Sequence, residues 1–334
     1  MVMKKLVVIV LIVFPIIVSN AQEKFSLSGK ISGYEDSTYI FLEVQDLRII
    51  DSALVENEEF EFKTKLDKAP IQSLLRNKNT SQYKLIWLED KKMTIDGVAT
   101  DLMGAEVKGS ETEAIVQEFV GILETKSPEA LKELENSFMQ KYNDNIFCAF
   151  YLSLAAPNYG KERTKELFSL LSEENKESEY GMQIKKFISL SRDLNIGDQF
   201  VDFTMPDLEG KERSLSDHNG KVVLLEFWAT WCSPCIEENP NLRKTYNNFK
   251  PKGFEIFAVS LDKNGEIWRK VIANDKLNWL HVSELTGFNN TATNIYNVYS
   301  IPDNFLIDQK GIIIGRNLRG AELDKQLEMI FGPL

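Results

Sequence analysis

The feature that most constrains the fold is a short apolar run followed closely by two cysteines. The run VVLLEFW spans residues 222–228, and only Glu226 interrupts it. Such a run is typical of a β-strand that is covered on both faces. Cys232 and Cys235 follow, and a stretch of helical character continues to about Phe249. The sequence therefore predicts a buried strand, a turn that carries both cysteines, and a helix that begins at this turn.

Two cysteines at this spacing have three chemical uses. A structural zinc site takes about four ligands, but the other candidates are only Cys148, His218 and His281, and they form no second pair at ligand spacing. A structural disulfide would enclose only two residues and remove little entropy from the unfolded chain. Redox chemistry fits best, because a cysteine near a helix N-terminus is favoured as a thiolate, the nucleophile of disulfide exchange. Cys232 would attack a partner, and Cys235, one turn later, would release it.

Strand-like and helix-like stretches alternate from Asn195 onward. A second apolar run, FEIFAVS, spans 254–260, and the runs FLIDQ and IIIGR flank a turn at Lys310-Gly311. This alternation predicts an α/β domain over 194–334, with a central sheet that helices cover on both faces.

The N-terminus has the parts of a secretory signal. Lys4 and Lys5 precede an apolar run over 6–18, and small residues lead up to Ala21. The run is shorter than the roughly 20 apolar residues of a membrane-spanning helix. We therefore expect residues 1–21 to be a signal peptide cleaved near Ala21, and the mature protein to be periplasmic.

The segment 22–108 has a β pattern. Apolar and charged residues alternate over 60–66, the period of a half-buried strand, and TYIFLEV (38–44) and YKLIWLE (83–89) are further β-rich runs. We expect a small antiparallel β-domain here.

The segment 109–193 is instead helical in character, because Glu, Lys, Leu and Phe dominate it. Ser127 before Pro128 predicts the N-cap and first residue of a helix. Cys148 lies in the apolar stretch FCAFYLSLA. This context predicts a buried, unreactive thiol, and an intermolecular disulfide is the alternative.

Charge and composition restrict the partners. The chain has 39 basic and 50 acidic residues, a formal charge of −11. Such a chain lacks the surplus of cations that neutralises nucleic-acid phosphates. We therefore expect no nucleic acid. The absence of a second ligand pair noted above leads us to expect no metal, and we also expect no cofactor.

Residues 195–334 resemble the thioredoxin superfamily, and more closely the TlpA/ResA-type thiol-disulfide oxidoreductases. The matching stretches are FWATWCSPC, IEENP, VYSIPDNFLIDQKGIII and LRGAELDKQLEMI. The resemblance implies a thioredoxin-like fold with a mixed sheet, and a secreted enzyme that reduces disulfides in envelope proteins. It also implies an upstream membrane electron donor.

The segment 22–108 is similar to the small β-domain that precedes thioredoxin domains in secreted Bacteroidetes-type proteins. The similarity rests on SGKISGYEDSTYIFLE and IIDSALVENEEFEFK. Our hypothesis is that this domain docks partners or forms a dimer.

The resemblance also assigns roles to further residues. Pro302 matches the cis proline of the family, and the backbone at Ile301 would pair with an extended peptide. Glu226 matches a buried acid that moves a proton for the second cysteine, since a buried carboxyl has a raised pKa. Glu238 matches a helix glutamate of ResA-type proteins, although an ordinary surface role is equally compatible with its position. Trp231 would shape the surface beside the first cysteine.

Two alternatives and one departure accompany this interpretation. Peroxiredoxins share the fold, but they place Thr or Ser three positions before the reactive cysteine and Pro seven before it, where this chain has Ala229 and Leu225. A non-catalytic partner-binding protein would not need both cysteines, the buried acid and the proline. The departure is Asp303, which follows the cis proline where relatives usually have Thr. An acid near Cys232 would disfavour the thiolate.

Overall fold

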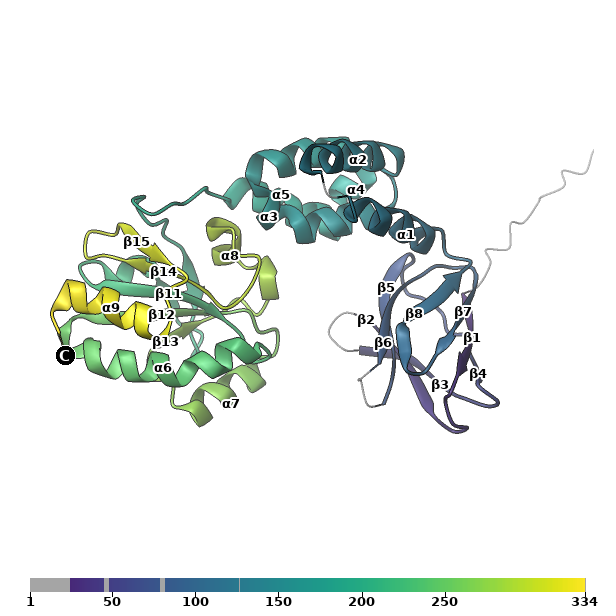
Figure 1. Cartoon of the computed structure of the whole chain (residues 1–334), viewed down its shortest axis with the longest axis horizontal. Helices are drawn as coiled ribbons and strands as arrows, with labels where there is room; N and C mark the ends of the chain where they lie inside the picture. The colour runs from purple at the N-terminus through teal and green to yellow at the C-terminus, as the bar shows by residue number, and fades with distance from the viewer. Residues whose placement is uncertain (1–24, 45–47, 79–81, 126, 334) are drawn as a thin grey trace, which may run out of the picture. The chain divides into compact units, whose positions relative to one another are not determined.

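The computed structural model describes residues 25–44, 48–78, 82–125 and 127–333 (Figure 1). The signal peptide predicted at 1–21 lies outside these residues. The chain divides into two compact units between Ala114 and Ile115.

The first unit contains two four-stranded sheets among its described residues, in the orders β4-β1-β7-β8 and β3-β2-β5-β6. Side chains from both sheets, including Leu27, Leu42 and Ile95, form one apolar core. The strands pair antiparallel as predicted, except that β1 and β7 pair in parallel. Their bounds are β1 Ser26–Ser32, β2 Tyr39–Val44, β3 Arg48–Leu54, β4 Glu59–Phe62, β5 Ile71–Asn77, β6 Tyr83–Leu88, β7 Lys92–Val98 and β8 Asp101–Lys108.

Strand β4 shows the predicted alternation, with Phe60 and Phe62 buried and the glutamates between and before them exposed. The strand ends at Phe62, whereas the alternating pattern continues to Leu66. Leu66 is nevertheless buried in the same core, so the pattern reports burial correctly and overestimates the length of the strand.

The helical segment is confirmed. Its helices are α1 Glu111–Leu123, α2 Pro128–Lys141, α3 Ile146–Leu170, α4 Glu173–Glu177 and α5 Glu179–Leu190. Ser127 is the N-cap of α2, and its side chain accepts a hydrogen bond from the backbone N–H of Ala130 at 3.3 Å. Rings from three helices, those of Phe119, Phe138 and Phe147, pack against one another.

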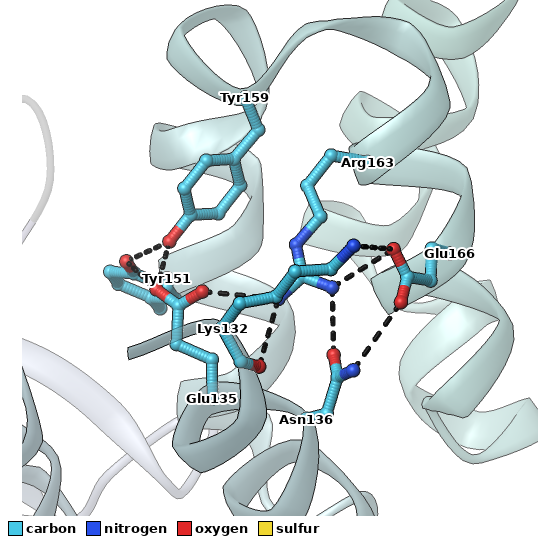
Figure 2. A network of polar contacts seen from close by, with 7 residues as sticks. All are labelled: Lys132, Glu135, Asn136, Tyr151, Tyr159, Arg163 and Glu166. Atoms are coloured by element: carbon cyan, nitrogen blue, oxygen red, sulfur yellow. Dashed lines mark hydrogen bonds and ion pairs between the residues drawn. The ribbon is translucent and has the colours of Figure 1, made fainter. Parts of the chain in front are cut away.

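Helix α3 is bent where it contains Pro157 and where Gly160 adopts a φ of 73°. Figure 2 shows how residues on both sides of the bend reach one carboxylate of α2. Tyr151 before the bend and Tyr159 within it donate to Glu135, and so does Arg163 after it. Because Glu135 is buried, this network fixes the two halves of α3 against α2.

The rest of the second unit surrounds a five-stranded sheet in the order β13-β12-β11-β14-β15. The sheet is mixed as predicted, because β11 pairs in parallel with β12 and antiparallel with β14. Every residue of β11 is buried, so both faces of the sheet are covered. The bounds are β11 Val222–Trp228, β12 Phe254–Ser260, β13 Leu280–Val282, β14 Asp303–Ile307 and β15 Ile313–Arg316.

Two of these strands coincide with the apolar runs 222–228 and 254–260. The runs FLIDQ and IIIGR overlap β14 and β15, and two short strands that lack such a run, β9 Thr204–Pro206 and β10 Glu212–Ser214, form a separate hairpin. The remaining elements are α6 Ser233–Phe249, α7 Gly265–Asp275, α8 Thr291–Tyr296 and α9 Gly320–Phe331, with the 3-10 helices η2 Leu215–His218, η3 Lys250–Lys252 and η4 Gly287–Asn289. In the described parts of the chain, no helix is both long and apolar enough to cross a membrane.

Candidate functional site

A disulfide joins Cys232 and Cys235 at the start of α6, just after β11. Cys232 is the N-cap of this helix, and its Sγ accepts a hydrogen bond from the backbone N–H of Cys235 at 3.3 Å. Both side chains are buried. The predicted pairing and its place at a helix start are confirmed. In the reduced protein, the helix N–H groups and dipole would favour a thiolate on Cys232.

A buried carboxylate holds the loop that leads to the disulfide. Asp262 accepts hydrogen bonds from the backbone N–H of Thr230 at 3.1 Å and from the Thr230 hydroxyl at 2.5 Å. It also accepts from the hydroxyl of Ser260, at 2.7 Å. The sequence interpretation missed Asp262. The available signal was an acid just beyond the carboxyl end of the apolar run 254–260, the end of a parallel strand at which ligand and catalytic sites gather.

The peptide bond between Ile301 and Pro302 is cis, as the resemblance implied. Asp303 lies opposite Phe227 across strands β14 and β11. Pro302 is therefore level with the end of β11 from which the cysteines follow. The carbonyl oxygen of Pro302 accepts a hydrogen bond from the Nη2 of Arg319, which fixes the orientation of this peptide group.

Asp303 is buried and paired. Arg316 donates to its carboxylate through Nη2 at 2.7 Å and through Nε at 3.3 Å. From the sequence alone, an unpaired acid at this position is expected to disfavour the thiolate of Cys232. In the structure its negative charge is balanced by a guanidinium on the neighbouring strand β15.

Glu226 is a buried acid in the middle strand of the sheet. It lies opposite Asn304 on β14. Burial raises the pKa of its carboxyl to about 8, while a hydrogen bond with Asn304 and the charge of Arg319 oppose this rise. Its Oε2 has no hydrogen-bond partner among the residues that the structure describes. Such a carboxyl changes protonation near neutral pH and can exchange a proton with a neighbouring group.

Glu238 ties two helices together. Its Oε1 accepts a hydrogen bond at 2.9 Å from the backbone N–H of Gly320, the first residue of α9, and its Oε2 accepts one from Asn241. Its charge also contributes to the raised pKa of Glu226. The side chain thus links α6 to the start of α9.

Two residues expected at the substrate surface lie beside this site. The side chain of Trp231 is 58% exposed, and its ring lies 6.3 Å from that of Phe288, centroid to centroid. Ile301 is half-buried and packs against the core of the domain. Trp231 therefore offers an apolar surface next to the buried sulfur of Cys232.

The remaining candidate metal ligands, one cysteine and two histidines, make none of the contacts described above. Cys148 is free and buried in α3, where burial raises the pKa of its thiol to about 12. His281 is buried against Trp279, and burial lowers its pKa to about 3. His218 is half-buried beside Phe257. In the part of the chain that the structure describes, no three His, Cys, Asp or Glu side chains gather as metal ligands do.

Family models match a part of each unit of the chain. Residues 196–316 match the model described as the AhpC/TSA family. Residues 25–115 match a model described as a domain of unknown function, DUF4369.

Curated relatives match the second unit. The chain is 33% identical over 142 residues to the thiol-disulfide oxidoreductase ResA of Bacillus cereus. This match covers 42% of this chain and 80% of that protein. It is 36% identical over 120 residues to the thioredoxin-like protein YneN of Bacillus subtilis, covering 35% and 68% respectively. Among solved structures, the thioredoxin domain of a thiol-disulfide oxidoreductase from Bacteroides vulgatus is 38% identical, with a TM-score of 0.39, and the match covers 41% of this chain and 99% of that one.

Proposed function

This chain belongs to the ResA-type thiol-disulfide oxidoreductases, and we propose that it is an exported reductase that donates electrons to disulfides of envelope proteins. The observation that carries this proposal is the Cys232–Cys235 disulfide with Cys232 as the N-cap of α6. The helix N-terminus favours the thiolate of Cys232, and the disulfide with Cys235 protects this sulfur reversibly.

The first step is attack on the partner. The thiolate of Cys232 forms a bond to one sulfur of the partner disulfide, and the partner's sulfur–sulfur bond breaks. The second partner sulfur leaves as a thiolate and takes a proton. The product is a mixed disulfide between Cys232 and the partner.

The second step releases the partner. Cys235 loses its proton and attacks the sulfur of Cys232, which restores the disulfide seen in the structure. The partner leaves with two thiols and has gained two electrons. Glu226 is the proposed proton acceptor for Cys235, because its pKa of about 8 allows both protonation states near neutral pH. Glu238 would assist through its electrostatic effect on Glu226.

Substrate contacts would come from three residues around the disulfide. The backbone at Ile301, held next to the cis bond of Pro302, would pair with an extended segment of the partner. Trp231, with its exposed ring, would cover the apolar part of that segment.

The proposed place of action is the periplasm, and an upstream membrane protein would return the chain to the dithiol form. The basic residues and apolar run before Ala21 support export. We further propose that the β-domain at 22–108 docks partners or forms a dimer, a role that its position before the enzyme domain motivates.

Trapping tests the exchange mechanism. The Cys235→Ser variant cannot complete the second step, so it should accumulate mixed disulfides with envelope proteins. A reducing agent should cleave these mixed disulfides. The matched control is the Cys232→Ser variant, which should trap none. Equal trapping by the two variants would contradict the assignment of Cys232 as the nucleophile.

The reduction potential tests the direction of electron flow. A value near or below about −200 mV for the Cys232–Cys235 pair would match the thioredoxin- and glutaredoxin-like donors. A value near about −120 mV would make the chain an oxidant and would overturn the proposed direction.

A further inference from the structure

A cavity of about 280 Å³ lies where the helical segment meets the sheet domain within the second unit. Leu154 and Pro157 of α3 and Phe187 of α5 form one wall, and Phe288 of η4 and Tyr299 form the other. The other residues that line it are serine, glutamine and asparagine, so none of its described walls carries a charge. The cavity therefore suits a neutral, apolar group.

Several of these apolar side chains remain open to solvent. Leu154 is 63% exposed and Tyr299 is 57% exposed. Single exposed apolar residues are common on protein surfaces. Exposed apolar residues that gather around one cavity are instead typical of a binding site.

The cavity is continuous with the surface of the redox site. Phe288 lies on its wall and also faces the ring of Trp231, the residue just before Cys232. On the same wall, Tyr299 lies two residues before Ile301, where the partner's backbone is expected to pair. This wall thus leads from the cavity toward the disulfide.

The wall contributed by the helical segment is fixed to the sheet domain. Lys186 of α5 donates hydrogen bonds to the backbone carbonyl of Asn289 at 2.9 Å and to the carboxylate of Glu284 at 3.5 Å. Ser191, just after α5, donates to the side chain of Asn297 at 2.6 Å. The cavity is therefore already formed before any substrate binds, which lowers the entropic cost of binding.

We propose that this cavity binds an apolar side chain of the polypeptide whose disulfide is presented to Cys232, and so selects substrates by sequence near their cysteines. The inference rests on the proposed function, since it requires a polypeptide disulfide as substrate. The volume is near the lower limit of about 300 Å³ for ligand pockets, which fits one large aliphatic or aromatic side chain. Phe288 on the cavity wall faces the ring of Trp231, the neighbour of Cys232. Because an extended chain advances about 3.3 Å per residue, we place the selected side chain a few residues from the substrate cysteine.

The experiment uses the full chain in its dithiol form and three disulfide probes. Two are synthetic peptides that each contain one disulfide and differ only in a leucine or a serine three positions from one cysteine. The third is glutathione disulfide, which is too small to reach both sites. The variant is Leu154→Glu, which places a charge in the cavity at an exposed position. The matched control is Met182→Glu, because Met182 on α5 is also exposed, at 52%, and does not line the cavity.

The wild-type chain should reduce the leucine peptide at least roughly tenfold faster than the serine peptide, the discrimination expected of an apolar pocket. Leu154→Glu should abolish this preference, and Met182→Glu should retain it. All three proteins should reduce glutathione disulfide at similar rates. Equal rates for the two peptides with wild-type chain, or a preference that survives Leu154→Glu, would overturn the inference and leave the proposed function intact. If the wild-type chain reduced none of the probes, the proposed function would fail, and this inference with it.

Discussion

Arg319 donates a hydrogen bond from its Nη2 to the carbonyl oxygen of Pro302. The charge of the same guanidinium lowers the pKa of Glu226, and its Nε has no hydrogen-bond partner in the described part of the chain. One side chain at the start of α9 therefore acts on both the peptide group proposed to bind substrate and the proposed proton acceptor. The sequence motif LRG contains this arginine, but nothing in the motif reveals either contact.

Replacement of Arg319 by glutamine should shift the pH dependence of disulfide reduction upward by about one pH unit. Without the positive charge, the pKa of Glu226 rises further above its ordinary value. The carboxylate that accepts a proton from Cys235 is then populated only at higher pH. The measurement is the rate of reduction of a peptide disulfide from pH 6 to pH 10, with Arg319→Lys as the control that keeps the charge. A profile that moves equally in both variants would mean that the hydrogen bond matters and the charge does not.

Replacement of Glu226 by glutamine should change how stability depends on pH. The pKa of about 8 in the folded chain exceeds the ordinary value of 4.5 for this carboxyl. Between these values the folded chain binds a proton that the unfolded chain has lost. The contribution of Glu226 to the free energy of unfolding should be fully present below pH 4.5. It should fall as pH rises through this window, by up to about 1.4 kcal/mol per pH unit. Urea unfolding of oxidised wild-type and Glu226→Gln protein at pH 5 and pH 8 checks this. The unfolding free energy of Glu226→Gln should change less between pH 5 and pH 8 than that of the wild type. An equal change in the two proteins would contradict the assignment of Glu226 as a buried acid.

The same Glu226→Gln substitution should slow substrate reduction by about 100-fold or more at neutral pH, the usual contribution of a general base. Trapping of mixed disulfides by a protein that also carries Cys235→Ser should continue, because Glu226 acts only in the second step. Loss of trapping would place Glu226 in the first step instead.

Replacement of Asp262 by alanine should destabilise the chain by about 3 kcal/mol, because the half-buried donors of Thr230 and the buried hydroxyl of Ser260 lose this acceptor. It should also slow exchange, since the loop before Cys232 would no longer be held. Asp202→Ala is the matched control, because Asp202 accepts from the backbone and hydroxyl of Ser216 at the surface. This control should cost about 1 kcal/mol or less. Equal losses, measured by denaturant unfolding, would contradict the structural role of Asp262.

Cys148 should resist alkylation in the folded, reduced protein. Its thiol is buried and its pKa is raised to about 12, so the reactive thiolate is scarce. Mass spectrometry after iodoacetamide treatment should find Cys232 modified and Cys148 unmodified until urea unfolds the chain. A dimer on a non-reducing gel that disappears in Cys148→Ser would instead support the intermolecular disulfide.

The sequence predicted those features whose signals are local. An apolar run defines β11 because burial on both faces leaves no polar positions except Glu226. Ser127 and Pro128 define the start of α2 because capping involves only neighbours in the chain. The spacing of Cys232 and Cys235 predicted a redox pair because the two cysteines are also neighbours in the chain.

Contacts between distant segments could not be predicted in this way. Asp262 belongs to the site because β12 lies beside β11, and Arg319 belongs to it because α9 begins beside β14. The cavity needs Leu154 and Phe288 from separate segments. Periodicity reports that a residue is buried or exposed, but it does not report which segment covers it.

The parallel pairing of β1 with β7 sets an order of assembly for the N-terminal unit. Strand β1 lies between β4 and β7, and a parallel partner cannot be supplied by a tight hairpin. In a chain synthesised from its N-terminus, one edge of β1 therefore stays unpaired until residues 92–98 follow. An unpaired edge is a template for association with other chains. Among the described strands, this edge of β1 is thus covered only once β7 has been synthesised, and a chain that stops before Val98 keeps the edge exposed.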